Sequence, residues 1–278
     1  MGFLCFHLEF HLCLPHSFVA KKNIMSNINQ FWQDFGYYHA QGVFSADELA
    51  LMEGDFDRIV AQMSNAGEDL NARWQGEEMA RLDGGQSVIF HTHQVQTFSA
   101  QWLRAIQNPR FLDVMEALIG PDIILHHTKL FQKPAENGSP FPMHQDYTYF
   151  PSVQDTMMAG VIFVSDATDE MGCLRVYPAS HKLGRVQRGE VLQEGLREEY
   201  PIENALVIEA KAGDVVFFNY LTLHGSMPNR SKQVRKTVLV QAHAGADEME
   251  QPHTHTYSGL TLRGWNYAAT RSKAAAAG

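Results

Sequence analysis

The chain has 278 residues and a formal net charge of −9 at pH 7. Nucleic acids and anionic membranes bind basic patches, so this acidic balance argues against both as partners. A hydrophobic fraction of 45% and a charged fraction of 19% are ordinary for a globular protein with a sizeable core. No stretch approaches the roughly 20 apolar residues of a transmembrane helix. We therefore expect a globular domain that neither binds nucleic acid nor spans a membrane.

The first 24 residues differ in character from the rest of the chain. They are apolar, yet they lack the basic start of a signal peptide and contain Glu9. We expect residues 1–24 to be an atypical leader that is disordered or not native, with Met25 as the natural start. Residues 25–270 are then expected to form a single domain, followed by a flexible alanine-rich tail at 271–278.

The cysteine content indicates a reducing compartment. Cys5, Cys13 and Cys173 are too few for a disulfide framework. Cys173 lies in a predicted strand, where a buried reduced thiol is favoured over a reactive one. The chain also ends without a peroxisomal Ser-Lys-Leu signal. We expect a cytoplasmic protein.

The first half of the chain has helical patterns. Residues 31–38 predict a short amphipathic helix. Ser45 and Glu48 form a capping box, which predicts a helix that runs to about Ser64 with one apolar stripe facing the core. Further helices are predicted at 102–106 and 110–119, and Gly120-Pro121 ends the second of them.

Beyond Ile123 the pattern changes to short strands separated by Gly, Pro and Asn turns. The predicted strands are 123–132, 157–164, 173–177, 205–209, 214–218 and 235–242. Many short strands after a group of helices predict a mainly β protein with flanking helices, built on a double-sheet jelly roll.

One motif in the strand region predicts a metal site. His144, Asp146 and the distant His224 supply two imidazoles and one carboxylate, the ligand set of non-haem Fe(II) oxygenases. In an extended segment His144 and Asp146 point to the same face and can reach one ion. The motif His-x-Asp is weak by itself in a chain with 14 histidines, where a polar loop beside a core histidine is the alternative.

The surroundings of the motif strengthen this interpretation. His224 follows a Gly-Asp turn and a short apolar run within 211–219. Arg235 lies in the next predicted strand, where its planar guanidinium could bind a dicarboxylate in bidentate fashion. Together these residues predict an oxygenase.

With these residues in place, the chain resembles the phytanoyl-CoA dioxygenase family of Fe(II)- and 2-oxoglutarate-dependent oxygenases. The resemblance covers about 31–242 and is strongest in four ordered blocks, which are 127–134, 143–151, 172–182 and 224–231. It implies a double-stranded β-helix, or cupin-like jelly roll, as the core of the fold.

The resemblance also implies roles for individual residues. His144, Asp146 and His224 are expected to bind iron and to be the catalytic centre, while Arg235 and Ser226 are expected to bind the distal carboxylate of 2-oxoglutarate. Two further candidates for cosubstrate binding lie where the chain departs from its relatives. Gln94 replaces an upstream lysine of some members, and Lys129 replaces an apolar contact.

The implied reaction uses Fe(II), 2-oxoglutarate and O₂ and releases succinate and CO₂. We expect hydroxylation of an unactivated C–H bond in a small molecule or an acyl-CoA. Family halogenases have a small residue in place of the carboxylate, so Asp146 favours hydroxylation over halogenation. The alternatives are a non-catalytic metal-binding jelly roll, and desaturation or ring formation on a secondary metabolite. The sequence does not identify the substrate or the oligomeric state.

Several other polar residues have two interpretations. His126 and His127 could contact cosubstrate or substrate, or belong to the core. Tyr147 and Tyr149 could line a substrate pocket, or point away from it. The segment that contains His253 and His255 resembles a metal-binding pair, but its polar surroundings favour a solvated loop.

Overall fold

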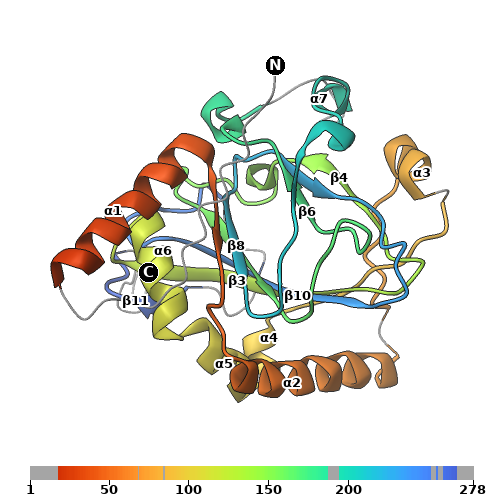
Figure 1. Cartoon of the computed structure of the whole chain (residues 1–278), viewed down its shortest axis with the longest axis horizontal. Coiled ribbons are helices and arrows are strands. Elements are labelled where there is room, and N and C mark those ends of the chain that lie inside the picture. Colours follow the sequence, from red (N-terminus) through yellow and green to blue (C-terminus); the bar gives the residue numbers. More distant parts are fainter. Residues whose placement is uncertain are drawn as a thin grey trace, which may run out of the picture.

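The computed structural model describes residues 18–67, 69–83, 85–186, 194–251, 255 and 259–267. Helices surround two antiparallel sheets (Figure 1). The α-helices are α1 Phe18–Phe35, α2 Ala46–Asn65, α3 Glu77–Asp83, α4 Val95–Phe98, α5 Ala100–Ile106, α6 Pro109–Ile119 and α7 Glu194–Glu199. Three 3₁₀ turns are η1 Asp146–Thr148, η2 Ser180–Leu183 and η3 Ile202–Asn204.

The strands form a large and a small sheet. The large sheet has the order β1-β8-β5-β10-β3-β11, and β2 also pairs with β3; the small sheet has the order β4-β9-β6-β7. The strands are β1 Tyr37–Ala40, β2 Phe90–His93, β3 Ile123–Lys133, β4 Phe141–His144, β5 Met158–Phe163, β6 Leu174–Val176, β7 Leu206–Ile208, β8 Val215–Asn219, β9 His224–Ser226, β10 Arg235–Ala244 and β11 Leu260–Arg263. This arrangement is the predicted jelly roll with flanking helices.

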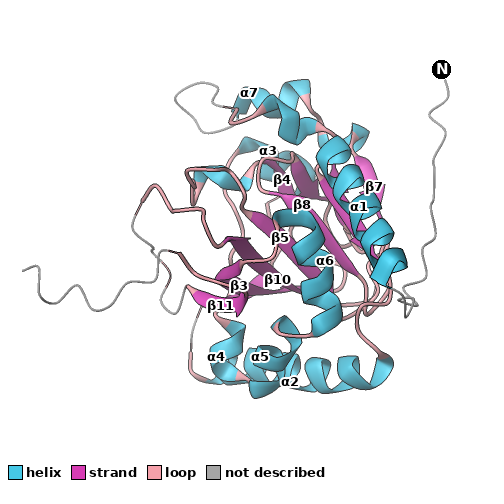
Figure 2. Cartoon of the chain, turned by 90° about the vertical axis from the view of Figure 1, so that its left-hand side faces the viewer, coloured by secondary structure: helices cyan, strands magenta, loops and turns pink. Residues whose placement is uncertain are grey.

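The helices pack on one face of the large sheet and enclose the main core. Figure 2 shows α6 in front of that sheet, with α2, α4 and α5 grouped at one end of it. Phe111 of α6 stacks on Phe217 of β8 with ring centroids 5.5 Å apart. On α2 the predicted stripe is buried through Met52, Phe56 and Ile59. Burying a side chain of this size contributes roughly 1.5–3 kcal/mol, so this face anchors the helical layer.

The capping box of α2 is confirmed. The Ser45 hydroxyl accepts a bond from the backbone N–H of Glu48, and the Glu48 carboxylate accepts one from the Ser45 N–H. These contacts satisfy two backbone donors that the first turn of a helix leaves unpaired. The helix therefore begins where the sequence predicts.

The prediction for 31–38 is wrong at its C-terminal end. Helix α1 ends at Phe35, and Tyr37–Ala40 is instead a strand that pairs with β8. The break lies at Gly36, which has a φ of +73°, where a Cβ would collide with His181 and Thr222. Only glycine fits such a position, and it turns the chain from helix into strand.

The structure describes only part of residues 1–24 and none of the tail at 271–278. Helix α1 begins at Phe18, inside the leader that the sequence sets apart at 1–24, and residues 1–17 and 268–278 lie outside the described residues. Among the described helices, none combines the length and the apolar character needed to cross a bilayer. Cys173 is buried and free, as predicted, and burial raises the pKa of its thiol to about 11.

Candidate active site

The small sheet brings His144 and His224 together. His144 is the last residue of β4 and His224 is the first of β9, and the two are register partners across this antiparallel pair. Their ring centroids are 4.1 Å apart. Asp146 is not on the strand, because β4 ends at His144 and η1 begins at Asp146. Gln145 still has an extended backbone, with φ −114° and ψ 140°, so the carboxylate returns to the same side as His144.

The two imidazoles point toward one carboxylate oxygen. Nε2 of His144 lies 3.4 Å from Oδ1 of Asp146, and Nε2 of His224 lies 3.6 Å from the same atom. The opposite ring nitrogen of each histidine contacts a backbone carbonyl two residues earlier, Pro142 at 2.8 Å and Thr222 at 2.9 Å. A carbonyl only accepts, so Nδ1 carries the proton and donates it, which leaves Nε2 as the free ligand atom.

Contacts with neighbouring side chains hold these groups in place. The other oxygen of Asp146, Oδ2, accepts a 2.7 Å bond from Nε2 of Gln241 on β10. His224 packs on Phe218, and Trp74 packs edge-on against His144. Burial, followed by the nearness of His144, lowers the pKa of His224 to about 4. His224 is therefore neutral at pH 7, as a metal ligand must be.

The middle residue of the motif fixes the turn. The Gln145 amide donates to the carbonyls of Leu221 at 2.5 Å and Gly184 at 3.0 Å, and its oxygen accepts from the N–H of Val186. The Asp146 N–H donates to the Tyr220 carbonyl at 2.9 Å. These bonds clamp the turn against the segment just before His224.

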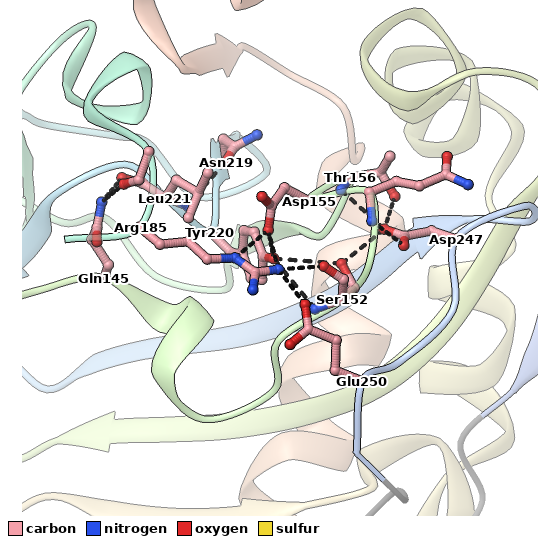
Figure 3. A network of polar contacts seen from close by, with 12 residues as sticks. Gln145, Ser152, Asp155, Thr156, Arg185, Asn219, Tyr220, Leu221, Asp247 and Glu250 are labelled. Carbon is pink, nitrogen blue, oxygen red and sulfur yellow. Dashed lines mark hydrogen bonds and ion pairs between the residues drawn. The ribbon is translucent and has the colours of Figure 1, made fainter. Parts of the chain in front are cut away.

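A polar network holds the segment between η1 and β5 (Figure 3). Arg185 donates to Oδ1 of Asp155 at 2.7 Å and forms an ion pair with Glu250 at 2.7 Å. Asp247 accepts a 2.8 Å bond from the Ser152 hydroxyl. These contacts join the loop after the motif to Arg185 and to the segment that contains Asp247 and Glu250. They hold in place the loop that follows Asp146.

A cavity of about 380 Å³ opens beside the three candidate ligands and is lined from both sheets. Aromatic and apolar side chains form much of its wall. They include Trp74, Phe131, Phe141, Tyr149, Phe150 and Val161. A largely apolar cavity with a few convergent polar groups is the usual form of a small-molecule site.

Two buried basic residues lie beside each other, and one of them, Arg235, lines the cavity. Arg235 begins β10 and pairs in register with Lys133, the last residue of β3. Lys133 is 0% exposed and donates to the Ser226 hydroxyl and the Met227 carbonyl, both at 2.7 Å. Arg235 donates through Nη1 to the Gly172 carbonyl, while its buried Nε has no hydrogen-bond partner among the described residues.

Neither cation has a carboxylate partner in the described part of the chain. Burial lowers the pKa of Arg235 to about 10, and burial together with the charge of Arg235 lowers the pKa of Lys133. A buried charge without a counter-ion is costly, so this end of the cavity is complementary to an anion. Arg235 and Ser226 both line the cavity and are available to such a ligand.

The two remaining cosubstrate candidates lie in different places. Lys129 of β3 lines the cavity, and burial lowers the pKa of its ammonium to about 8. Gln94 is buried at the N-terminus of α4 with a φ of +59°, and it is not among the residues that line the cavity. Its side-chain oxygen accepts a 2.7 Å bond from Gln96. The structure therefore brings Lys129 to the site but not Gln94.

The structure places the neighbouring residues for which the sequence allowed two interpretations. His127 and Tyr149 line the cavity, whereas the Tyr147 hydroxyl donates to the Val186 carbonyl. His255 also lines the cavity, and His253 lies outside the described residues. Sequence reasoning missed Lys133 and Gln241, because only the packing of the two sheets brings them to Ser226 and Asp146.

The residues fit the implied groups. Three ligand atoms of His144, Asp146 and His224 lie within 4.8 Å of one another, and all three residues line the cavity. Two imidazoles and a carboxylate suit Fe(II) and leave positions open for other ligands. The unpartnered Nε of Arg235 fits the distal carboxylate of 2-oxoglutarate.

Comparisons with known proteins agree with this chemistry. The probable alpha-ketoglutarate-dependent hypophosphite dioxygenase of Stutzerimonas stutzeri is 27% identical over 230 residues, which are 77% of this chain and 76% of that protein. The peroxisomal phytanoyl-CoA dioxygenase of Bos taurus is 33% identical over 236 residues, 80% of this chain and 69% of that protein.

Solved structures show the same fold. The epimerase SnoN in complex with Fe³⁺, alpha ketoglutarate and nogalamycin RO has a TM-score of 0.69 at 20% identity, covering 88% of this chain and 98% of that one. The family model described as phytanoyl-CoA dioxygenase matches residues 32–237. The chain therefore belongs to the phytanoyl-CoA dioxygenase family of Fe(II)- and 2-oxoglutarate-dependent oxygenases, which confirms the class of enzyme and the cofactors predicted from the sequence.

Proposed function

We propose that this dioxygenase holds Fe(II) through His144, Asp146 and His224 and hydroxylates an unactivated C–H bond of a small molecule or an acyl-CoA. The overall reaction consumes the substrate, O₂ and 2-oxoglutarate and forms the alcohol, succinate and CO₂. When bound, Fe(II) and 2-oxoglutarate supply the oxidising power for the C–H bond. The protein contributes binding, orientation and exclusion of water.

The arrangement of the two imidazoles carries the proposal. Both Nε2 atoms face Oδ1 of Asp146, at 3.4 Å and 3.6 Å, and both Nδ1 protons are held by backbone carbonyls. This fixes the tautomer and the ring orientation before any metal binds. A carbonyl that holds the far ring nitrogen in this way is typical of metal ligands and is not needed by a histidine that only fills space.

The proposed role of Arg235 and Ser226 is to bind the distal carboxylate of 2-oxoglutarate. The guanidinium of Arg235 offers its unpartnered Nε, and the hydroxyl oxygen of Ser226 is already occupied by the ammonium of Lys133. The hydroxyl proton of Ser226 is then free to be donated to an anion. Charge-assisted bonds of this kind are roughly twice as strong as neutral ones.

Aromatic side chains are proposed to keep water away from the substrate. Trp74 and Tyr149 line the cavity, and their ring centroids are 6.3 Å apart. A closed apolar wall strengthens electrostatic contacts and protects reactive groups from side reactions. Asp146 supports hydroxylation as the outcome, because the family's halogenases lack this carboxylate. No contact in the described residues favours a non-catalytic role, desaturation or ring formation.

The test is an anaerobic titration of metal-free protein with Fe(II) and then 2-oxoglutarate. We expect a visible charge-transfer band from the cosubstrate complex in the wild type and none in His144→Ala. His181→Ala serves as the matched control, since this histidine lies outside the cavity lining and contacts the Gln33 carbonyl. Absence of the band in a folded wild type would contradict the proposal and favour a non-catalytic metal binder.

Substrate choice needs a separate measurement. Succinate release can be screened with phytanoyl-CoA, ectoine and hypophosphite, which appear in the names of relatives of this chain. A substrate counts only if its hydroxylated product forms in step with succinate, because uncoupled turnover also releases succinate.

A further inference from the structure

A second group of histidines lines the same cavity on the side of the large sheet. His93 is the last residue of β2, and His127 lies on the neighbouring strand β3. His255 comes from the segment before β11. All three line the cavity, and none belongs to the group formed by His144, Asp146 and His224.

The three rings are close enough to share one ion. The ring centroid of His255 is 4.4 Å from that of His127 and 4.9 Å from that of His93. One nitrogen from each ring lies within 4.8 Å of the others. Ligand nitrogens that are each about 2.1 Å from an ion can be at most about 4.2 Å apart. The rings of His127 and His255 are stacked at an interplanar angle of 18°, so the half-buried His255 would have to turn for the three nitrogens to converge on an ion.

Burial lowers the pKa of two of these imidazoles, His93 and His127. Burial, and then the charge of Lys129, lowers the pKa of His93 to about 3. Burial, and then the neighbouring His126, places the pKa of His127 well below its ordinary value.

His127 also has a contact that orients its ring. Nδ1 of His127 lies 2.7 Å from Nδ1 of His126, so one of these atoms donates and the other accepts. When Nδ1 of His127 donates, its Nε2 is left as the ligand atom. His126 then accepts the proton of Nδ1, as backbone carbonyls do for His144 and His224. His126 is 2% exposed, so solvent does not compete for this bond.

We propose that His93, His127 and His255 form a second metal site, which binds a divalent transition ion such as Zn²⁺. Three imidazoles are a common zinc ligand set, and they leave a fourth position open. In that position the ion would bind an oxygen anion of a ligand in the cavity. Lys129 is the register partner of His93 and also lines the cavity.

The test counts metal ions per chain in tag-free protein that has been stripped with a chelator. The protein is dialysed against Zn²⁺ without 2-oxoglutarate, and bound zinc is measured by elemental analysis. Both sites accept Zn²⁺, so we expect two equivalents in the wild type. His255→Ala and His144→Ala should each retain one equivalent, and the double variant should retain none. Circular dichroism checks folding, and His93→Gln replaces His255→Ala if that variant does not fold.

The outcomes separate this proposal from the function proposed above. One equivalent in the wild type, lost in His144→Ala and kept in His255→Ala, would overturn the second site and leave the iron site intact. Two equivalents that survive His255→Ala and His93→Gln would place the second ion elsewhere and would also overturn the proposal. Loss of a single equivalent in each of the two single variants is the result that supports it.

Discussion

The ammonium of Lys133 donates a 2.7 Å hydrogen bond to the hydroxyl oxygen of Ser226. Lys133 is fully buried at the end of β3, and Ser226 ends β9, so the bond joins the large sheet to the small one. A lysine can only donate, and the serine oxygen therefore accepts. This leaves the hydroxyl proton of Ser226 free to point at an anion in the cavity.

Removing this hydroxyl should weaken cosubstrate binding. We expect Ser226→Ala to raise the KM for 2-oxoglutarate roughly 10- to 100-fold, as for one lost hydrogen bond to a charged group. The value of kcat should change little, because the iron ligands are untouched. Ser226→Thr keeps the hydroxyl and is the matched control. Steady-state kinetics that give the same KM for Ser226→Ala and the wild type would exclude the proposed contact.

Replacement of Arg235 should raise the KM for 2-oxoglutarate more than replacement of Ser226 does. Arg235→Ala removes a buried guanidinium and leaves the anion with the Ser226 hydroxyl, so we expect the KM for 2-oxoglutarate to rise by about 30-fold or more. Arg235→Lys retains the charge but not the planar fork, and it should fall between the wild type and Arg235→Ala. A parallel loss of kcat without a change in KM would contradict a binding role for this residue.

Gln241 is expected to tune iron affinity without touching the ion. Its Nε2 donates to Oδ2 of Asp146 at 2.7 Å and so holds the carboxylate with Oδ1 toward the histidines. Gln241→Leu should weaken Fe(II) binding by about 10- to 100-fold, the usual effect of losing such a partner. Anaerobic Fe(II) titration measures this directly. An unchanged dissociation constant would mean that Asp146 keeps its orientation without this bond.

The network in Figure 3 gives a prediction for stability against pH. Burial opposes the charge of Asp247, but bonds from Thr156, Gln154 and Ser152 outweigh it and hold the pKa of this carboxyl below its ordinary value. The folded pKa lies below the unfolded value of about 3.9, so the contribution is complete above about pH 4 and is lost as the pH falls through the folded value.

Asp247→Asn should therefore lower the free energy of unfolding by roughly 1–3 kcal/mol at pH 7, because an amide NH2 replaces one of the two oxygens that accept from Ser152, Gln154 and Thr156. Below pH 4 the difference from the wild type should shrink. Urea unfolding at pH 7 and pH 3 measures both values. A difference that stays constant over this range would show that ionisation of Asp247 does not contribute.

The longer strands of the fold were predictable because they are apolar. The residues of β3, β5, β8 and β10 are β-formers that are buried on one or both faces, and their predicted ranges match the structure to within two residues at each end. The short strands β2 and β9 were not delimited by the sequence. Their residues, Phe-His-Thr-His and His-Gly-Ser, face a cavity with polar side chains and therefore lack the alternation that marks a strand.

The candidate site was predictable where the residues are close in sequence or belong to a family motif. His144, Asp146, His224, Ser226 and Arg235 all line one cavity. Lys133 and Gln241 could not be placed, because their partners depend on the register between β3 and β10 and on the packing of the two sheets. Gln94 was inferred from a poorly aligned stretch, and the structure places it outside the cavity lining.

The division of the site between two sheets has a mechanical consequence. His144, His224 and Ser226 belong to the small sheet, whereas Arg235 begins a strand of the large one. A dicarboxylate bound at both ends would link the two sheets of the jelly roll. Saturation with it should therefore raise the temperature at which the protein unfolds.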